Sequence, residues 1–411
     1  MLTILRNARI FDGHSEDLIE GVSVIVEGER IREITEHVPP FKDATLIDCS
    51  GKVLMPGLID AHFHAYTPSF DVARTDRMPP ALLASHAARI LEGALQRGFT
   101  TVRDAAGGDV GLWLAIEQGL IKGPRFFYPG KAISQTGGHG DMRPADSVEP
   151  CACGRYSGSL SVVADGVDEM RRTVRGELRK GAHHIKLFIS GGVVSPTDPV
   201  WMPQFTEEEI RAAVYEASTR KAYVMAHCLT DEGAQRCVQY GIRSIEHGAE
   251  ITAQTAQLIA SKGAFMVPTL SVLHVIRRHG SSIGVPSKAL GKVGELLGSA
   301  LRSIENCIAA GVKMGLGADL LDHAFHPLQG GELELRGEVN RPIDVLRSAT
   351  SINAELLQRT GELGCIAPNA YADILVINGD PLRDLALFRN PEANIPLVMK
   401  GGACVRNELA K

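Results

Sequence analysis

The chain has 411 residues, of which 44% are hydrophobic, 22% charged and 5% aromatic; this composition is typical of a globular protein and excludes a fibrous or disordered chain. Its 43 basic and 48 acidic residues give a net charge of −5 without a block of like charges, which argues against nucleic acid or an acidic membrane surface as partner. Charged residues from Arg6 onward interrupt the apolar start, and no later run reaches about 18 apolar residues, so we expect neither a secretory signal nor a membrane span.

The eight cysteines are scattered along the chain, which predicts free thiols in a reducing cytoplasm. Only Cys151 and Cys153 lie close together. Their spacing does not match a zinc knuckle, and no Cys-His cluster lies nearby. We therefore expect this pair to staple a loop or to have no role.

Both ends of the chain are rich in strand-like segments and lack long helices. At the front these are Leu2–Ile10, Val22–Val26 and Arg32–Ile34, and at the back Ala372–Ile377 and Leu397–Val405. The simplest interpretation is one small β-sandwich domain assembled from residues 1–56 and 366–411, with the rest of the chain inserted between them. In the alternative, the terminal strands cap the central unit separately.

Between these ends, β-rich runs alternate with amphipathic segments, the pattern of repeated βα units around a parallel sheet. The eight runs are Leu54–His62, Thr100–Asp104, Arg125–Pro129, His184–Ile189, Tyr223–His227, Ser244–His247, Ala264–Leu270 and Lys313–Asp319. The clearest helices are Ala81–Arg97, Val167–Lys180, Thr206–Arg220, which starts with a Thr206–Glu209 capping box, and Asp231–Tyr240. We predict an α/β fold in which residues 57–365 form a (β/α)8 TIM barrel.

Side chains that can do chemistry recur at the ends of these runs, where the βα loops of a barrel open to solvent. His62 and His64 are two residues apart on a strand, so both point to the same side and can bind one cation. Single histidines end the fifth and sixth runs, and Asp319 ends the eighth. Imidazoles with a carboxylate suit zinc, so these residues predict a metal site.

Lys186, in the fourth run, requires a separate explanation. An ammonium group among cations is repelled, so a lysine inside this cluster must lose its proton or be modified. Carboxylation by carbon dioxide would give it a carbamate with two oxygens, enough to bridge two metals. In the alternative, Lys186 is an interior lysine paired with a carboxylate.

Several segments carry a family resemblance: Val53–His64 (VLMPGLIDAHFH), the strand of Lys186, His227, Glu246–Gly248 (EHG), Gly315–Asp319 (GLGAD) and Ala372–Val376 (ADILV). Together they resemble the amidohydrolase superfamily in its two-zinc, carboxylated-lysine branch. The segments Gln135–Asp141 (QTGGHGD), Ser190–Asp198 (SGGVVSPTD) and Ile395–Lys400 (IPLVMK) resemble a narrower, prolidase-like group. Its members cut dipeptides or N-acyl amino acids, and some relatives cleave toxin-like or drug-like amides.

The resemblance implies a role for each matching position. His62, His64 and Asp319 would hold one zinc and His227 and His247 the other, with carboxylated Lys186 and a hydroxide bridging the two Zn²⁺ ions. Asp319 would also take the proton of the attacking water and pass it to the leaving nitrogen. His139 would steady the carbonyl oxygen as it gains charge, or would instead anchor its glycine-rich loop.

One position departs from the prolidase-like pattern. Relatives carry a tyrosine two residues beyond the fifth-strand histidine, whereas Leu229 stands there in this chain. The change removes a hydrogen-bond donor from the substrate side and favours a larger or more apolar substrate group. Among the other histidines, His183 and His184 receive no role, and His323 and His326 lie in a loop that can contact substrate.

We therefore expect a zinc-dependent amidohydrolase that cleaves the amide bond of a dipeptide or N-acyl amino acid. The alternative is a detoxifying amidase or carbamate hydrolase for an aryl amide or a mycotoxin-like molecule. A non-catalytic scaffold is a third alternative, against which the presence of all six ligands argues. The partner is a small-molecule amide, and the resemblance implies a homo-oligomer.

Overall fold

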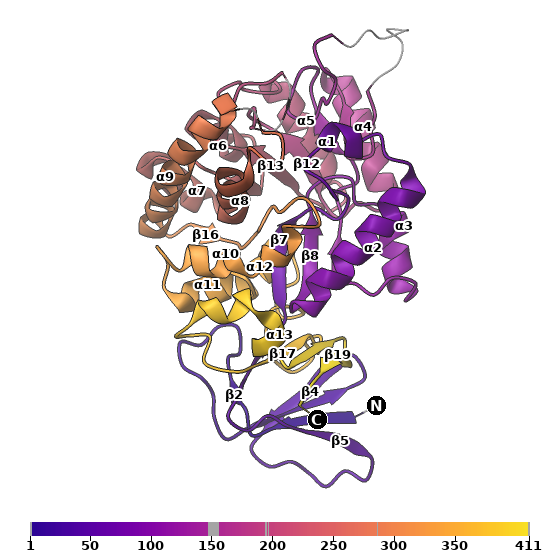
Figure 1. The fold of residues 1–411 in the computed structure, drawn as a ribbon, viewed down its shortest axis with the longest axis vertical. Coiled ribbons are helices and arrows are strands. Elements are labelled where there is room, and N and C mark those ends of the chain that lie inside the picture. Colours follow the sequence, from indigo (N-terminus) through magenta and orange to yellow (C-terminus); the bar gives the residue numbers. More distant parts are fainter. Residues whose placement is uncertain (1, 147–155, 194, 196, 286, 410–411) are drawn as a thin grey trace.

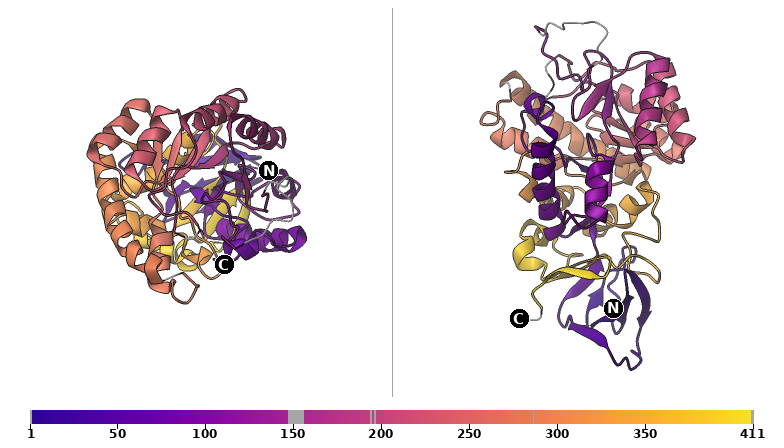
Figure 2. Two further views of the ribbon diagram at one scale, coloured as in Figure 1. Left: turned by 90° about the horizontal axis from the view of Figure 1, so that it is seen from above. Right: turned by 90° about the vertical axis from the view of Figure 1, so that its right-hand side faces the viewer.

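The computed structural model describes residues 2–146, 156–193, 195, 197–285 and 287–409. In Figure 1 a small β-rich unit, built from both ends of the chain, lies below a larger unit of strands and helices. Seen from above, the helices of the larger unit form a ring around its strands (Figure 2). The Cys151–Cys153 pair lies outside the described residues, whereas the six cysteines within them are free thiols.

Two sheets make up the small unit. One has the order β4-β3-β1-β5 and contains β1 (Leu2–Arg6), β3 (Ser23–Glu27), β4 (Arg30–Thr35) and β5 (Ala44–Asp48). The other has the order β19-β18-β17-β6-β2 and contains β2 (Arg9–Ile10), β6 (Val53–Pro56), β17 (Ile374–Ile377), β18 (Leu397–Lys400) and β19 (Ala403–Asn407). Because β17 pairs with β6, both ends of the chain share a sheet, and one apolar cluster connects the two sheets. The domain boundaries at residues 56 and 366 stay a prediction.

The strands of the larger unit run parallel in two sheets. The first holds β7 (Leu58–Phe63), β8 (Phe99–Asp104) and β9 (Arg125–Phe127). The second has the order β11-β10-β12-β13-β14-β15-β16 and holds β10 (Ala132–Ser134), β11 (Ser161–Val163), β12 (Ile185–Phe188), β13 (Val224–Cys228), β14 (Ser244–His247), β15 (Phe265–Val267) and β16 (Lys313–Met314).

The parallel α/β class is confirmed, but the described strands form two hydrogen-bonded sheets rather than one closed ladder. Backbone hydrogen bonds cross both gaps. The amide of Ala61 donates to the carbonyl of Leu316 over 2.8 Å, and that of His183 donates to Tyr128 over 2.9 Å. The two sheets thus approach each other at both gaps although their ladders are interrupted.

The four helices expected most clearly are present within two residues of their predicted ends, as α2 (Pro80–Gln96), α4 (Val167–Arg179), α5 (Glu207–Ser218) and α6 (Asp231–Gln239). The Thr206–Glu209 capping box at α5 is confirmed. The remaining helices are α1 (Val72–Thr75), α3 (Val110–Glu117), α7 (Ala253–Lys262), α8 (Leu270–His279), α9 (Ser287–Ala310), α10 (Gly331–Arg336), α11 (Pro342–Ser348), α12 (Ser351–Leu356), α13 (Pro391–Asn394) and the 3-10 turns η1 (His326–Leu328) and η2 (Leu385–Arg389). Within the described part of the chain, no helix is both long and apolar enough to cross a membrane.

The expected single strand Leu54–His62 was wrong, because the chain divides it at Gly57. Residues before this point join the small unit as β6, and residues after it begin the larger unit as β7. A Cβ atom on residue 57 would lie 2.0 Å from Oγ1 of Thr100, so only glycine fits where the chain passes between the two sheets. The apolar sequence of this segment does not indicate that its two halves pair with strands of different sheets.

Candidate active site

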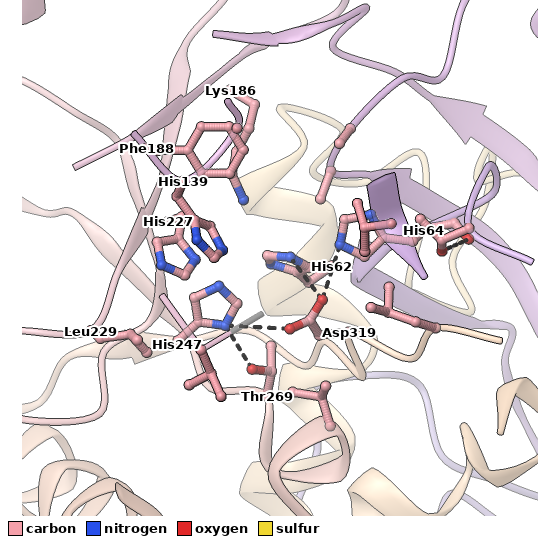
Figure 3. Close-up of a pocket in the computed structure, with 18 of the residues that line it drawn as sticks. His62, His64, His139, Lys186, Phe188, His227, Leu229, His247, Thr269 and Asp319 are labelled. Atoms are coloured by element: carbon pink, nitrogen blue, oxygen red, sulfur yellow. Dashed lines mark hydrogen bonds and ion pairs between the residues drawn. The ribbon is translucent and has the colours of Figure 1, made fainter. Parts of the chain in front are cut away.

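The six predicted metal ligands, together with His139 and Leu229, meet in one cavity of about 140 Å³. They come from the carboxyl ends of different strands and from the loops that follow them, and Figure 3 shows their side chains converging. The lining includes His62, His64, His139, Lys186, His227, Leu229, His247 and Asp319. The structure thus places these residues together, while their individual roles stay predictions.

Three of them form a compact group that could hold a metal ion. One ligand atom each from His62, His64 and Asp319 lies within 4.8 Å of the other two. Nε2 of His64 is 3.0 Å and Nε2 of His62 is 3.4 Å from Oδ1 of Asp319. Burial opposes ionisation of Asp319, but the neighbouring histidines lower its pKa overall. The carboxylate of Asp319 is therefore ionised at neutral pH.

The other three predicted ligands extend this group across the cavity. The His62 and His247 rings are 4.8 Å apart, and the His247 and His227 rings 4.6 Å apart, measured between centroids. Lys186 is buried, and its side chain points toward these rings (Figure 3). Loss of hydration lowers the pKa of Lys186 to about 8. All six side chains predicted to bind cations thus line one cavity.

Polar groups behind the histidines fix their orientation. Glu246 Oε2 lies 2.8 Å from Nδ1 of His62, the Gly191 carbonyl 3.1 Å from Nε2 of His227, and Thr269 Oγ1 2.8 Å from Nδ1 of His247. Each contact occupies one ring nitrogen and leaves the other for a ligand, as is usual for metal-binding histidines. Burial lowers the pKa of all three imidazoles well below the ordinary value, so they are neutral. This donor set fits a divalent cation such as zinc.

An ion pair lies directly beneath the His62 side of the cavity. The Arg103 guanidinium donates from Nη2 to both carboxylate oxygens of Glu246 over 2.9 Å, and from Nε to the Ala61 carbonyl over 2.5 Å. Both charged side chains are fully buried. The guanidinium holds the carboxylate in place, and Oε2 of Glu246 can accept a hydrogen bond from Nδ1 of His62.

Two of the eight described non-glycine residues with a positive φ are predicted ligands. His247 has φ 71° and Asp319 φ 54°, a left-handed conformation that is uncommon for residues other than glycine. Such strain costs about 1–3 kcal/mol at each position and persists where the surrounding structure enforces it. Its presence at these two strand ends supports a functional role for the cavity.

His139 faces the cavity from the loop after β10. Its Nδ1 lies 3.2 Å from Oδ2 of the buried Asp198 and 2.7 Å from Oγ of Ser195, and its ring stacks on His227 with 4.3 Å between centroids. A Cβ on Gly192 would lie 1.9 Å from this ring, so glycine alone leaves room for it. His139 is thus held rigidly beside the predicted ligands.

The cavity wall opposite His139 is apolar. Leu229 lies there with residues of α8 and α9, namely Leu270, Val272, Leu273, Ile276 and Ala300. Apart from the histidines, Lys186 and Asp319 are the only ionisable side chains among the described lining residues. The wall therefore offers dispersion contacts and no salt bridge to a bound molecule.

Histidines without a predicted role lie away from this cavity. His184 is buried, with Nε2 3.0 Å from the Asp104 carbonyl, and the His183 ring packs edge-on against Tyr128. His323 lies with its Nε2 2.7 Å from Nδ1 of His86, and neither His323 nor His326 lines the cavity. The expectation that these last two lie beside the substrate is not supported by their positions.

Four contributors to the site had no assigned role at the level of sequence: Arg103, Glu246, Asp198 and Thr269. Glu246 and Asp198 each stand in a quoted motif, which was their only signal. Arg103 and Thr269 contact the site through bonds between distant segments, and no local pattern reveals such pairs.

Comparisons of the sequence and of the structure with known proteins point to the same family. The sequence profile of the Amidohydrolase family matches residues 53–405. Ochratoxinase from Aspergillus niger is 32% identical over 369 residues, which cover 85% of this chain and 75% of that protein. Its crystal structure superposes with a TM-score of 0.85 at 28% identity, covering 99% of this chain and 96% of that one.

Two solved structures are similar over almost their whole length. A prolidase complexed with N-methylphosphonate-L-proline is 42% identical with a TM-score of 0.94, covering 99% of this chain and 100% of that one. A Xaa-Pro dipeptidase with methionine bound in its active site is 26% identical with a TM-score of 0.88, again covering 99% and 100%. The similarity to these structures therefore extends over both units of the chain.

Proposed function

The chain belongs to the amidohydrolase family and is a hydrolase of carbon–nitrogen bonds, and we propose that it cleaves the amide bond of a dipeptide or N-acyl amino acid. The observation that carries this proposal is the meeting of His62, His64 and Asp319 within 4.8 Å, in the cavity that His227, His247 and Lys186 also line. The prolidase at 42% identity supports the substrate class.

Two zinc ions fit these donors. His62, His64 and Asp319 would hold one ion, His227 and His247 the other, and carboxylated Lys186 would contribute to both. The free ring nitrogens of the histidines and the buried, desolvated amine of Lys186 support this assignment. A lysine amine adds to carbon dioxide only in its neutral form, with loss of a proton, and burial favours that form. When bound, the two ions would acidify a water molecule and polarise the scissile carbonyl.

Side chains of the protein would transfer the proton and stabilise the charge that develops during the reaction. Asp319 would accept a proton as water adds to the carbonyl carbon, and would deliver it to the leaving nitrogen as the C–N bond breaks. The products are a carboxylate and an amine. His139 would donate from Nε2 to the carbonyl oxygen as charge develops there, and Asp198, beside its Nδ1, would hold the ring in position.

A second candidate substrate is an aryl amide or carbamate, including mycotoxin-like molecules. Leu229 and the leucines of α8 offer an apolar surface, and Lys186 is the only lysine or arginine among the described lining residues. Ochratoxinase is one of the curated relatives. A bulky apolar group on this wall is stabilised by about 25 cal/mol for each Å² of apolar surface that it buries.

The test compares zinc-loaded protein with metal-free protein on matched substrates: Xaa-Pro dipeptides, N-acyl amino acids with apolar or charged side chains, and aryl amides without a carboxylate. We expect turnover of the amino-acid conjugates that disappears on chelation and returns with zinc. Turnover of aryl amides alone supports the second candidate. Undiminished turnover by the metal-free protein contradicts the mechanism.

Three further features are also proposed. We propose that the two parallel sheets form one (β/α)8 barrel, which the backbone hydrogen bonds across both gaps support. We also propose a homo-oligomer in the cytoplasm. Sedimentation at several concentrations tests the assembly, and a single monomeric species at all of them contradicts it.

A further inference from the structure

A second cavity, of about 340 Å³, lies outside the candidate active site. It opens between α2 and the segment around η1, two elements that contact each other. Its lining consists of Arg89, Ile90, Arg97, His323, His326 and Pro327. Four of these six side chains are arginine or histidine, and none is acidic.

Both arginines of this cavity lack a carboxylate partner within the described part of the chain. Arg97 is partly buried and donates from Nε and Nη2 to the neutral amide oxygen of Gln329, over 3.3 and 3.0 Å. Arg89 is exposed at the rim. Burial lowers the pKa of Arg97 to about 10, so it remains charged at neutral pH. The cavity thus presents two guanidinium groups that form no ion pair with a described carboxylate, and the buried carboxylate of Asp60 acts on Arg97 only from behind Gln329.

His326 supplies a second, independent observation. Its side chain is 3% exposed, and neither ring nitrogen has a hydrogen-bond partner among the residues that the structure describes. A buried polar atom without a partner costs about 1–3 kcal/mol, so such atoms usually contact a ligand or ordered water. The ring belongs to the lining of the cavity, beside the two arginines.

We propose that this cavity binds a small oxyanion, such as inorganic phosphate or a carboxylate. Arg89 and Arg97 would each donate charge-assisted hydrogen bonds to its oxygens, and the rings of His323 and His326 would donate further ones. A larger basic groove of about 670 Å³ lies between α8 and α10. Unlike the smaller cavity, it contains an acidic side chain, because Glu334 lines it and pairs with Arg389 over 3.1 Å.

The bound oxyanion would also stabilise the base of the candidate active site. Gln329, which accepts from Arg97, donates to Oδ2 of Asp60 over 2.8 Å, and Oδ1 of Asp60 accepts the backbone N–H of His62 over 3.0 Å. On its other face, His326 packs against Phe63, with 5.4 Å between ring centroids. Occupancy of the cavity therefore adds order to the strand that carries His62 and His64.

Titration of the purified protein with inorganic phosphate, at constant ionic strength and by isothermal calorimetry, tests the proposal. We expect saturable binding that is weakened about tenfold or more in Arg97→Met and in Arg89→Met, since each loses charge-assisted hydrogen bonds. Arg89→Met is the second variant because its exposed side chain is not needed for packing. The matched control, Arg278→Met, removes an arginine of the larger groove and should bind as the parent protein does.

Phosphate bound at the candidate active site would survive both cavity substitutions, so unchanged affinity in Arg89→Met and Arg97→Met overturns the proposal. Binding that depends on Arg278, or binding that never saturates, overturns it as well. Acetate in place of phosphate identifies the ligand chemistry. Acetate binding that the same two variants lose indicates a carboxylate, and binding of phosphate alone indicates a phosphate group.

Discussion

Oε2 of Glu246 lies 2.8 Å from Nδ1 of His62, and Arg103 holds the same carboxylate from below. Replacing Glu246 with glutamine removes the charge that fixes this imidazole and leaves Arg103 buried without a counterion. We expect zinc affinity to fall by about 10–100-fold and the free energy of unfolding to fall by about 3 kcal/mol. Competition with a chromogenic chelator measures the first and urea denaturation the second.

A double variant, Arg103→Met with Glu246→Gln, separates these two effects. It removes both buried charges, so most of the lost stability should return. Zinc affinity should stay low because His62 still lacks its carboxylate. Recovery of zinc affinity in the double variant would show that Glu246 acts only on stability.

The two-zinc assignment predicts that Lys186 controls metal content. In Lys186→Ala we expect fewer zinc ions per chain and turnover reduced at least about 100-fold, because the bridging ligand is lost. Metal-free parent protein should take up zinc more completely with bicarbonate than in solution freed of carbon dioxide. Lys262→Ala, at an exposed position in α7, is the control and should match the parent. Full zinc content in Lys186→Ala contradicts the assignment.

Substitution of Gly192 tests the role of His139 without replacing any predicted metal ligand. A Cβ atom at residue 192 would lie 1.9 Å from the His139 ring, so Gly192→Ala must displace that ring. We expect kcat to fall about 10²–10³-fold, as for loss of an oxyanion donor, with zinc content unchanged. Gly176→Ala in α4 has no atom within 4 Å of the added carbon and should leave activity intact. Unchanged kcat in Gly192→Ala argues against a role for His139.

Leu229 sets the balance between the two candidate substrates. A tyrosine at this position restores a hydroxyl donor and interrupts the apolar wall. We expect the ratio of kcat/KM for Xaa-Pro dipeptides over aryl amides to rise about tenfold, the value of one hydrogen bond. Leu120→Tyr, on an exposed leucine, is the control. An unchanged ratio means that Leu229 does not contact the substrate.

Burial lowers the pKa of His183 from 6.5 to about 4. The unfolded chain therefore binds a proton at higher pH than the folded protein does, and the stability that the neutral ring contributes, complete above pH 6.5, is lost progressively as the pH falls toward 4. The loss is up to about 3 kcal/mol. Urea denaturation of metal-free protein at pH 7 and pH 4.5 should show a smaller difference in His183→Gln than in the parent or in His37→Gln, an exposed control. Equal differences in all three contradict the assignment.

Local patterns were sufficient for much of the fold and for the ligand positions. The capping box at Thr206 and the glycine that ends α2 belong to single segments, so their signals are contained in a few neighbouring residues. The strand-end rule brought His62 and Asp319 to one cavity although more than 250 residues separate them. Periodicity and position within a parallel βα unit are enough for this level of detail.

Local sequence patterns could not predict the contacts between segments that are distant in the chain. Glu246 reaches His62 from another strand, and Asp198 reaches His139 from another loop. The division of the first strand at Gly57 also depends on Thr100, which lies on β8. Such pairs are set by three-dimensional packing, and the sequence near each residue contains no trace of its partner.

The single residue between β6 and β7 leaves the chain no slack. β6 is bonded to β17 from the far end of the protein, while β7 carries His62 and is followed directly by His64, within seven residues of Gly57. Because no flexible loop separates β6 from β7, a displacement of the terminal sheets also displaces His62 and His64. Substitutions that destabilise β17, β18 or β19 should therefore weaken zinc binding, although these strands supply no predicted ligand.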